Sequence, residues 1–227
     1  MFATAQNTKN LAAAKPTIMA TPAEKLARSL EALERFQREG RACLRSRDIA
    51  RADRERLMRN GFLKEVMKGW YIVSRPEEGQ GESTAWFASF WGFCAEYLTE
   101  RFGTEWCLSP DQSLLLHAGN WTVPTQLLVR AGRGSNRPVQ LLHGTSLLDV
   151  RQALPAQDDI EVLDGVRVYK LDAAFVAASP NFYINHPTDA RALLAMQRDA
   201  GPLLARLLSG GHTAIAGRIA GAFRNIG

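Results

Sequence analysis

The sequence has few of the residues that build disulfide frameworks, metal sites and catalytic centres. It contains three cysteines, at positions 43, 94 and 107, with no C-x-x-C spacing, so neither a disulfide framework nor a zinc site is predicted. Its four histidines are scattered, with no carboxylate or cysteine at metal-ligand spacing. No G-x-S-x-G, Walker loop or H-E-x-x-H motif is present. We therefore expect a protein of the reducing cytoplasm that is not an enzyme by itself and uses no cofactor.

Long apolar runs are also missing. No stretch reaches the roughly 18 consecutive apolar residues that a membrane-spanning helix needs. The stretch "LLAMQRDAGPLLARLL" is interrupted by Arg198, Asp199 and Arg206. Residues 1–20 contain two lysines, no acid and no apolar run of the length found in a secretory signal. We expect residues 1–20 to form a flexible tail and the protein to have no membrane partner.

Positive charge, in contrast, is concentrated in one segment. The net charge of the chain is +5. Residues 41–75 hold ten basic and four acidic side chains, an excess of +6, whereas the rest of the chain sums to −1. Such a patch is what the neutralisation of nucleic-acid phosphates would use. A solvated basic face without a partner is the alternative that the charge alone leaves open.

The segment before this patch carries a helix signal. Residues 21–24, "TPAE", form a capping box with proline at the first helical position, so a helix should begin at Pro22. Leucines and a phenylalanine then recur at helical spacing, and Gly40 is the natural end of the helix.

Two shorter helices are predicted inside the basic segment. Ser46 can cap the first, "RDIA", and Asp53 can cap the second, "RERLMRN", which ends at Gly61. About three residues remain between them for a turn, which is the helix-turn-helix arrangement. In the second helix, Leu57 should face the core, with Met58 partly buried beside it.

A hairpin is predicted to follow these helices. Residues 62–66 and 70–73 are strand-like, and Gly69 can take the positive φ that a tight turn needs. The order of helices followed by a hairpin is that of a winged helix-turn-helix, to which we assign residues 21–76. Residues 77–83, polar and rich in glycine, are predicted to be a linker.

Residues 84–227 are predicted to form a mixed α+β domain with a C-terminal helical region. The stretch "TAWFASFWGFCAEYLTERFG" has no interleaved positive charge, so we expect a buried helix and not a base-stacking platform. A capped helix, "DQSLLLHAG", and four strand-like runs follow: "TQLLVRA", "VQLLHGT", "IEVL" and "VRVYKL". Asp164-Gly165 should join the last two as a hairpin. From Asp172 onward we expect four helical stretches: "DAAFVAAS", "PTDARALLAMQRDA", "GPLLARLLSG" and "HTAIAGRIAGAFRNIG". The expected fold class is α+β, with an N-terminal winged helix-turn-helix.

The segment "RSRDIARADRERLMRNGFLKEVMKGWYIVSRP", residues 45–76, resembles the N-terminal winged helix of the AbiEi-type antitoxin family of bacterial transcriptional regulators. The matching positions are Ser46, Arg47, Ile49, Leu57, Gly61, Leu63, Val66, Gly69 and Tyr71. The later string "LSPDQSLLLHAGNWTVPTQLLVR" also resembles the second domain of that family. The resemblance implies an N-terminal domain that binds DNA and represses its own operon. It also implies a C-terminal domain that neutralises a partner toxin or forms an assembly.

A second resemblance concerns the aromatic stretch from Gly69 to Arg130. It is similar to the N-terminal region of certain bacterial Fic-family proteins, in which a winged helix precedes an AMP-transferring domain. The Fic signature H-P-F-x-x-G-N-G-R is absent from this chain, and the final helix, "AFRNIG", has no cap, as expected if a further domain followed. This resemblance implies the alternative function, a protein-interaction or regulatory module that docks a toxin or a Fic domain without specific DNA binding.

If the winged helix binds double-stranded DNA, the second helix, Asp53 to Asn60, is the recognition helix. Its arginines and its asparagine should then enter the major groove, because Arg can read guanine and Asn adenine. Arginines before that helix should hold phosphates, and cations of the hairpin should contact the backbone or the minor groove. The predicted DNA-binding residues are Arg45, Ser46, Arg47, Arg51, Arg54, Arg56, Arg59, Asn60, Lys64, Lys68 and Arg75. Trp70 and Tyr71 should pack the hairpin onto the helices. The sequence leaves open the operator, the toxin and the oligomeric state, whether monomer or dimer.

Overall fold

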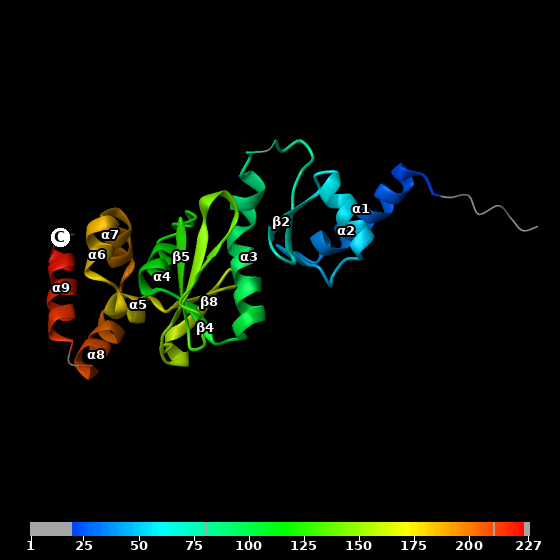
Figure 1. The fold of residues 1–227 in the computed structure, drawn as a ribbon. Coiled ribbons are helices and arrows are strands. Elements are labelled where there is room, and N and C mark those ends of the chain that lie inside the picture. The colour runs from blue at the N-terminus through cyan, green and yellow to red at the C-terminus, as the bar shows by residue number, and fades with distance from the viewer. Residues whose placement is uncertain (1–19, 80, 211, 225–227) are drawn as a thin grey trace, which may run out of the picture.

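A computed structural model describes residues 20–224 except residues 80 and 211 (Figure 1). The predicted tail, residues 1–20, therefore lies outside the described residues except for its last position. The protein mixes helices with several small sheets, which agrees with the expected α+β class. Of the helices in the described part of the chain, none is both long enough and apolar enough to span a bilayer.

The N-terminal unit, residues 21–76, contains two helices and a three-stranded antiparallel sheet of order β1-β3-β2. Both helices pack against one face of this sheet through a shared cluster of buried side chains. The elements are α1 (Pro22–Arg38), β1 (Leu44–Arg45), α2 (Arg51–Arg59), β2 (Leu63–Met67) and β3 (Trp70–Val73).

Local signals in the sequence account for the start of α1 and for the two turns that end α2 and join the hairpin strands. The Thr21 hydroxyl accepts a hydrogen bond from Glu24 N–H at 3.2 Å, and the Glu24 carboxylate accepts one from Thr21 N–H at 2.8 Å, so the capping box is confirmed. Gly61 and Gly69 have φ values of +77° and +83°, which an L side chain rarely adopts. The hairpin prediction is confirmed, with its first strand one residue later than expected.

The short helix predicted after Ser46 is wrong. Residues 46–49 form a turn, in which Ser46 N–H donates to Gly69 C=O at 3.0 Å. The Asp48 carboxylate accepts from Arg45 N–H at 2.8 Å, and such local side-chain bonds compete with helix formation. The predicted cap of the next helix is also wrong: α2 begins at Arg51, after Ala50, and the Asp53 side chain has other partners.

The sheet of the N-terminal unit is covered on both faces. On one face, Leu44, Leu63 and Tyr71 pack against α1 and α2. On the other, Trp70 and Ile72 join the core built on the next helix, α3 (Thr84–Phe102). Three consecutive residues of β3 are therefore buried, where a hairpin with one wet face would alternate.

Helix α3 stands between the N-terminal unit and a central four-stranded sheet (Figure 1). This sheet has the order β4-β5-β7-β6, with β5 parallel to β7 and the other pairs antiparallel. A separate hairpin, β8–β9, lies beside β4. These elements are β4 (Trp106–Leu108), α4 (Pro110–His117), β5 (Gln126–Ala131), β6 (Pro138–Gln140), β7 (Ser146–Arg151), β8 (Ile160–Leu163) and β9 (Val166–Tyr169), with 3-10 turns at Leu142–Gly144 and Gln157–Asp159.

The sequence predicted part of this region. The aromatic helix, the helix capped by Ser109 and the Asp164-Gly165 hairpin are confirmed. The run "VQLLHGT" was expected to be one strand, but only its first two residues lie in β6, and a 3-10 turn follows. Strands β1, β4 and β7 were not expected. Strand β7 contains Asp149, which is fully buried and ion-paired with Arg101 at 2.7 Å, so it lacks the apolar pattern of a buried strand.

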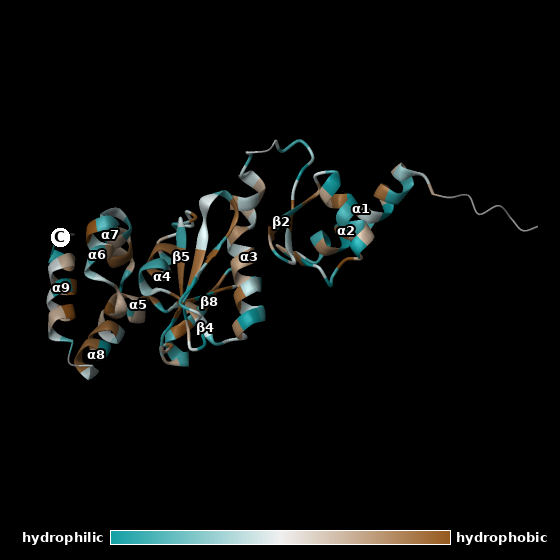
Figure 2. Cartoon of the chain, viewed as in Figure 1, coloured by the Kyte–Doolittle hydropathy of each residue, from teal (hydrophilic) through white to brown (hydrophobic). Residues whose placement is uncertain are grey.

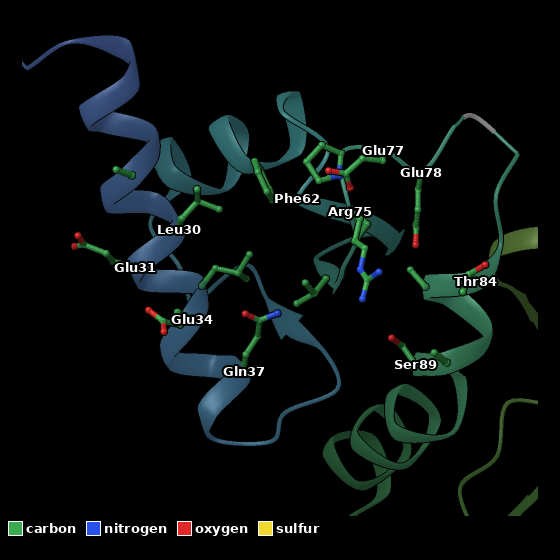
Figure 3. Close-up of a pocket in the computed structure, with 17 residues that line it drawn as sticks. Leu30, Glu31, Glu34, Gln37, Phe62, Arg75, Glu77, Glu78, Thr84 and Ser89 are labelled. Atoms are coloured by element: carbon green, nitrogen blue, oxygen red, sulfur yellow. The ribbon is translucent and has the colours of Figure 1, made fainter.

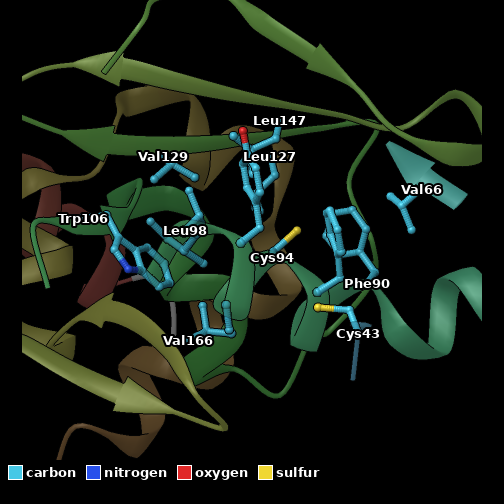
Figure 4. Packing of buried hydrophobic residues seen from close by; sticks show 14 of the residues in the cluster. Cys43, Val66, Phe90, Cys94, Leu98, Trp106, Leu127, Val129, Leu147 and Val166 are labelled. Carbon is cyan, nitrogen blue, oxygen red and sulfur yellow. The ribbon is translucent and has the colours of Figure 1, made fainter. Parts of the chain in front are cut away.

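The largest core lies on both sides of α3. Helix α3 contributes fully buried Trp86, Phe90 and Phe93, and Figure 2 shows hydrophobic residues concentrated in the strands of the central sheet beside it. Cys43 and Val66 of the N-terminal unit belong to the same cluster, and Figure 4 shows them next to Phe90. The predicted linker, residues 77–83, therefore separates two regions of sequence that share one hydrophobic core.

In the described part of the chain after the last hairpin, five helices pack on the far side of the central sheet, around Phe175, Phe182 and Leu193. The short helix α6 was not expected, whereas the other four were. Arg206 on α8 forms ion pairs with Asp172 of α5 at 2.5 Å and with Asp159, just before β8, at 2.6 Å; the second pair joins the helical region to the start of the β8–β9 hairpin. The helices are α5 (Leu171–Ala177), α6 (Pro180–Asn185), α7 (Pro187–Met196), α8 (Gly201–Ser209) and α9 (Thr213–Arg224).

Replacing Phe93 by alanine tests the shared core. The Phe93→Ala change should lower the free energy of unfolding by about 3–5 kcal/mol, because a fully buried ring leaves a cavity. Chemical denaturation followed by tryptophan fluorescence should still show one transition, since Trp70 and Trp86 pack against the same ring. Phe87→Ala, on the same helix but at a ring that is 42% exposed, is the control and should cost less than about 1 kcal/mol. Two separate transitions, only one of them shifted, would contradict a shared core.

Candidate nucleic-acid interface

The basic segment is the main concentration of charge in the structure, and its side chains decide where a polyanion could bind. Among residues 20–224, apart from the two gaps, no group of three or more histidine, cysteine or acidic side chains could hold a metal ion. We therefore followed each predicted DNA-binding residue to its contacts.

Helix α2 presents one face to the core and one to solvent. Leu57 is fully buried, as predicted, and Met58 is 36% exposed at the edge of the outward face. Arg51, Glu55 and Arg59 are exposed on the outward face, at helical spacing. Arg51 Nε lies 2.7 Å from Glu55 Oε1, and this hydrogen bond lowers the pKa of Glu55 below its ordinary value.

Arg56 points inward, contrary to the prediction that it faces the major groove. Its Nη1 donates to Ser29 Oγ at 2.6 Å and to Asp53 Oδ1 at 2.9 Å. It also donates to the carbonyl of Lys25 at 3.2 Å. Since Ser29 is fully buried, Arg56 supplies a donor that joins α2 to α1. Its role here is structural.

Two of the arginines predicted to hold phosphates are paired with an acid of α3. Glu100 forms ion pairs with both Arg45 and Arg47, the second at 2.9 Å. The hydrogen bond from Arg45 lowers the pKa of Glu100 below its ordinary value. The Arg45 guanidinium also lies over the Trp70 ring, 4.8 Å from its centre. These contacts partly neutralise two of the arginines that the sequence assigned to DNA binding.

Arg41, a further cation of the basic segment, is also paired with acidic side chains. Its Nη2 lies 2.7 Å from Asp48 and 3.7 Å from Glu96 of α3. Burial alone would raise the pKa of Asp48, but hydrogen bonds from Arg45 N–H and Arg41 outweigh it and lower the pKa. Helix α3 thus places Glu96 and Glu100, one turn apart, against the basic segment. Two glutamates four residues apart on the aromatic helix were a signal in the sequence that the basic segment would be partly neutralised, and the prediction of DNA contacts did not use it.

Arg54 lies where α2 meets the hairpin. Its guanidinium is 5.5 Å from the centre of the Tyr71 ring and donates to the Ser46 carbonyl at 3.0 Å. Because Ser46 N–H bonds Gly69 C=O, the backbone of Ser46 connects Arg54 to the tip of the hairpin, where Lys68 is exposed. The structure therefore brings Arg54 and Lys68 together from two elements.

The other predicted residues have separate places. Lys64 Nζ lies 3.3 Å from the carbonyl of Glu82, in the segment that leads to α3. The Asn60 amide donates to the Arg56 carbonyl at 2.8 Å and caps the end of α2. Arg75 lines a groove between α1 and α3, apart from the hairpin tip. The expected packing onto the helices of the N-terminal unit is confirmed for Tyr71, whereas Trp70 is buried against Phe93 and Tyr97 of α3.

The remaining cations define a basic surface, which consists of Arg51, Arg54, Arg59 and Lys68. In the part of the chain that the structure describes, only Arg51 of these four has a carboxylate within ion-pair distance. Beside Arg59 is a hollow of about 420 Å³ that is also lined by Lys25 and the first residues of α1. The sequence reasoning did not single out Lys25, because it lies outside the basic segment. The surface carries three guanidinium groups and one ammonium group, which are donors of the kind that contact phosphates.

The three cysteines are buried, and their thiols are held in the protonated, weakly reactive form. Burial raises the pKa of Cys43 and Cys94 far above the ordinary thiol value. It also raises the pKa of Cys107 from 9.0 to about 12. A thiolate nucleophile is therefore not available at these positions near neutral pH.

Thiol titration tests this conclusion. At pH 8 the raised pKa leaves far less of Cys107 as thiolate than of a free thiol, and burial also keeps the reagent away from the sulfur. Ellman's reagent should therefore react very slowly with the native chain and rapidly with all three thiols in guanidinium chloride. Rapid reaction of even one thiol in the native protein would show that its site opens or that its pKa is lower.

A pair of arginine variants tests the inward position of Arg56. Arg56→Met should lower the free energy of unfolding by about 1–2 kcal/mol, because Ser29 and Asp53 lose a hydrogen-bond donor. Arg59 is exposed at the end of the same helix, so Arg59→Met should change the free energy of unfolding by less than about 0.5 kcal/mol. Urea denaturation of both variants gives the comparison. Equal effects would mean that Arg56 is as free as Arg59.

Comparison with known proteins adds no family assignment: no protein-family model matches the chain, and no curated protein matches it in sequence.

Proposed function

We propose that residues 21–76 form a winged helix that binds double-stranded DNA through α2 and the tip of the β2–β3 hairpin. The observation that carries this proposal is the basic surface, in which cations from a helix and a hairpin tip are connected through the backbone of Ser46. The protein would then act as an antitoxin-type transcriptional regulator that represses its own operon, as the resemblance of residues 45–76 implies.

The dimensions of α2 suit the major groove. An α-helix with its side chains is about 10–12 Å across, and the groove is about 12 Å wide, so the nine-residue α2 can lie in it. With its outward face in the groove, Arg59 and Arg54 can reach base edges, where a guanidinium pairs with guanine. Glu55 on the same face can accept from the amino group of cytosine once Arg51 turns toward a phosphate.

Phosphate contacts fall on either side of the helix. Lys68 at the hairpin tip lies on one side, and Lys25 beside Arg59 lies on the other. Cations at these two places would set the register of α2 on the duplex without reading sequence. Arg45 and Arg47 contribute less than the sequence suggested, since Glu100 already neutralises them in part.

The alternative from the sequence is a module that docks a toxin or a Fic domain without specific DNA binding. Both functions can coexist in an antitoxin, whose second domain would neutralise the toxin. They differ in what the basic surface does: a docking module would keep its protein complex when Arg54 and Arg59 are removed, whereas an operator complex would be lost.

The test is DNA binding at two salt concentrations. Fluorescence anisotropy should show that the duplex upstream of the chain's own gene binds at least about tenfold more tightly than a scrambled duplex, with affinity that falls steeply between roughly 50 and 200 mM salt. The double variant Arg54→Ala/Arg59→Ala should lose this preference, since each guanine contact contributes about 1–3 kcal/mol.

A charge-matched control separates specific contacts from net charge. Arg191→Ala/Arg198→Ala removes two exposed arginines of the C-terminal helical region and should keep the preference for the upstream duplex. Circular dichroism of the Arg54 variant is needed because that side chain packs on Tyr71. Equal affinity of the native chain for the upstream and scrambled duplexes would refute specific regulation.

A further inference from the structure

The N-terminal unit has a second feature, an acidic groove between α1 and the first turns of α3. Its volume is about 880 Å³, and Figure 3 shows it with α1 on one side and α3 on the other. None of the four residues of the basic surface lines it. A ligand in this groove would therefore leave the proposed DNA contacts free.

The walls of the groove are two helix faces and its floor is apolar. Along α1 the lining runs from Ala27 to Gln37, a distance of about 15 Å or three helical turns. The α3 wall includes Ala85 and Ala88, whose small side chains let another backbone come close. Phe62 contributes to the floor and is partly buried against the core of the N-terminal unit.

The charge of the groove is negative, in contrast to the basic surface. Its lining contains four glutamates, Glu31, Glu34, Glu77 and Glu78, and one arginine, Arg75. Glu34 is already paired with Arg38 at 2.6 Å. Within the described residues, Glu78 Oε2 is shielded from solvent and has no hydrogen-bond donor. Figure 3 shows the side chains of Glu78 and Arg75 extending into the groove from the same edge.

We propose that this groove docks an amphipathic α-helix of a protein partner, with lysine or arginine beside its apolar stripe. The apolar floor fits the stripe, and the length of the α1 wall fits about three turns of helix. A cation next to the stripe would give Glu78 the donor that it lacks. Alanines on the α3 wall permit the interaxial distance of roughly 8–10 Å at which helices pack. Duplex DNA is disfavoured here by the four glutamates.

This inference goes beyond the proposed DNA binding and does not rest on it. The two surfaces share no residue, so one chain could hold a duplex and a partner helix at once. Such an arrangement suits a repressor in which binding of a partner protein changes the fraction of operator DNA that is bound.

The test is selection from a displayed library of helices. Peptides of about 16 residues would carry a fixed apolar stripe and randomised charges at the flanking positions, and the full chain would serve as the bait. A parallel selection would use as bait the variant Ala88→Arg, which places a long cation at an exposed position of the α3 wall. We expect the enriched peptides to carry an excess of lysine and arginine beside the stripe.

Binding of the enriched peptides to purified variants supplies the second readout. Their affinity should fall at least about tenfold in Ala88→Arg and also fall in Glu78→Gln. Ala205→Arg, an equivalent change at an exposed alanine of α8, is the matched control and should bind like the native chain. Thermal unfolding should show that all three variants remain folded.

Three results would overturn the proposal. The first is no enrichment over the starting library, and the second is enrichment of acidic or neutral peptides that bind Ala88→Arg as well as the native chain. The third is a dimer that sedimentation detects in the native chain and not in Ala88→Arg, which would assign the groove to a second copy. Loss of DNA specificity in Arg54→Ala/Arg59→Ala leaves peptide binding unchanged, so failure of the two proposals can be told apart.

Discussion

The burial of β3 on both faces is the constraint on which the rest of the structure depends. Tyr71 points to α1 and α2, and its neighbours Trp70 and Ile72 point to α3. A hairpin held in this way cannot swing as a free wing, because β3 is covered on both of its faces. Its tip and the outer positions of β2 are what it can offer to a partner. The same burial fixes α2 relative to α3, since both pack on one small sheet.

Electrostatics follows from this packing. Because α3 covers the sheet, its Glu96 and Glu100 lie within reach of the basic segment. Glu96 also accepts the backbone N–H of Ala42 at 2.9 Å, so it supports the chain just before β1. The positive excess of residues 41–75 is thus divided: part of it joins the N-terminal unit to α3, and part is directed outward on α2 and the hairpin tip. A local count of charges could not show this division, because the compensating acids lie about 50 residues further along the chain.

Elements with strong local signals were predictable, and those that depend on distant partners were not. The capping box at Thr21, the glycines that end helices and turns, and the aromatic helix act within a few residues of sequence. Strand β1 has two residues and exists because β3 supplies its hydrogen bonds. Strand β7 carries a buried aspartate whose partner, Arg101, is on another element.

The candidate site shows the same division. The position of Leu57 on α2 followed from helical spacing, but the inward turn of Arg56 needed Ser29 on α1, which no local pattern reveals. The pairing of Arg45 with Glu100 likewise joins two elements far apart in the sequence. Sequence reasoning could therefore locate the basic segment, while only the packing of α1 and α3 could sort its arginines into those that hold the fold and those that face outward.

The shared core also sets an order in time for a chain that leaves the ribosome from its N-terminus. Residues 21–76 contain all three strands of the small sheet, yet Trp70 and Ile72 find their cover only on α3, which ends at Phe102. At about 5–20 residues per second, several seconds of synthesis separate the completed hairpin from the arrival of that cover. During this interval the nascent sheet exposes an apolar face. The face formed by Trp70 and Ile72 is thus the last part of the N-terminal unit to complete its packing, when α3 folds onto it.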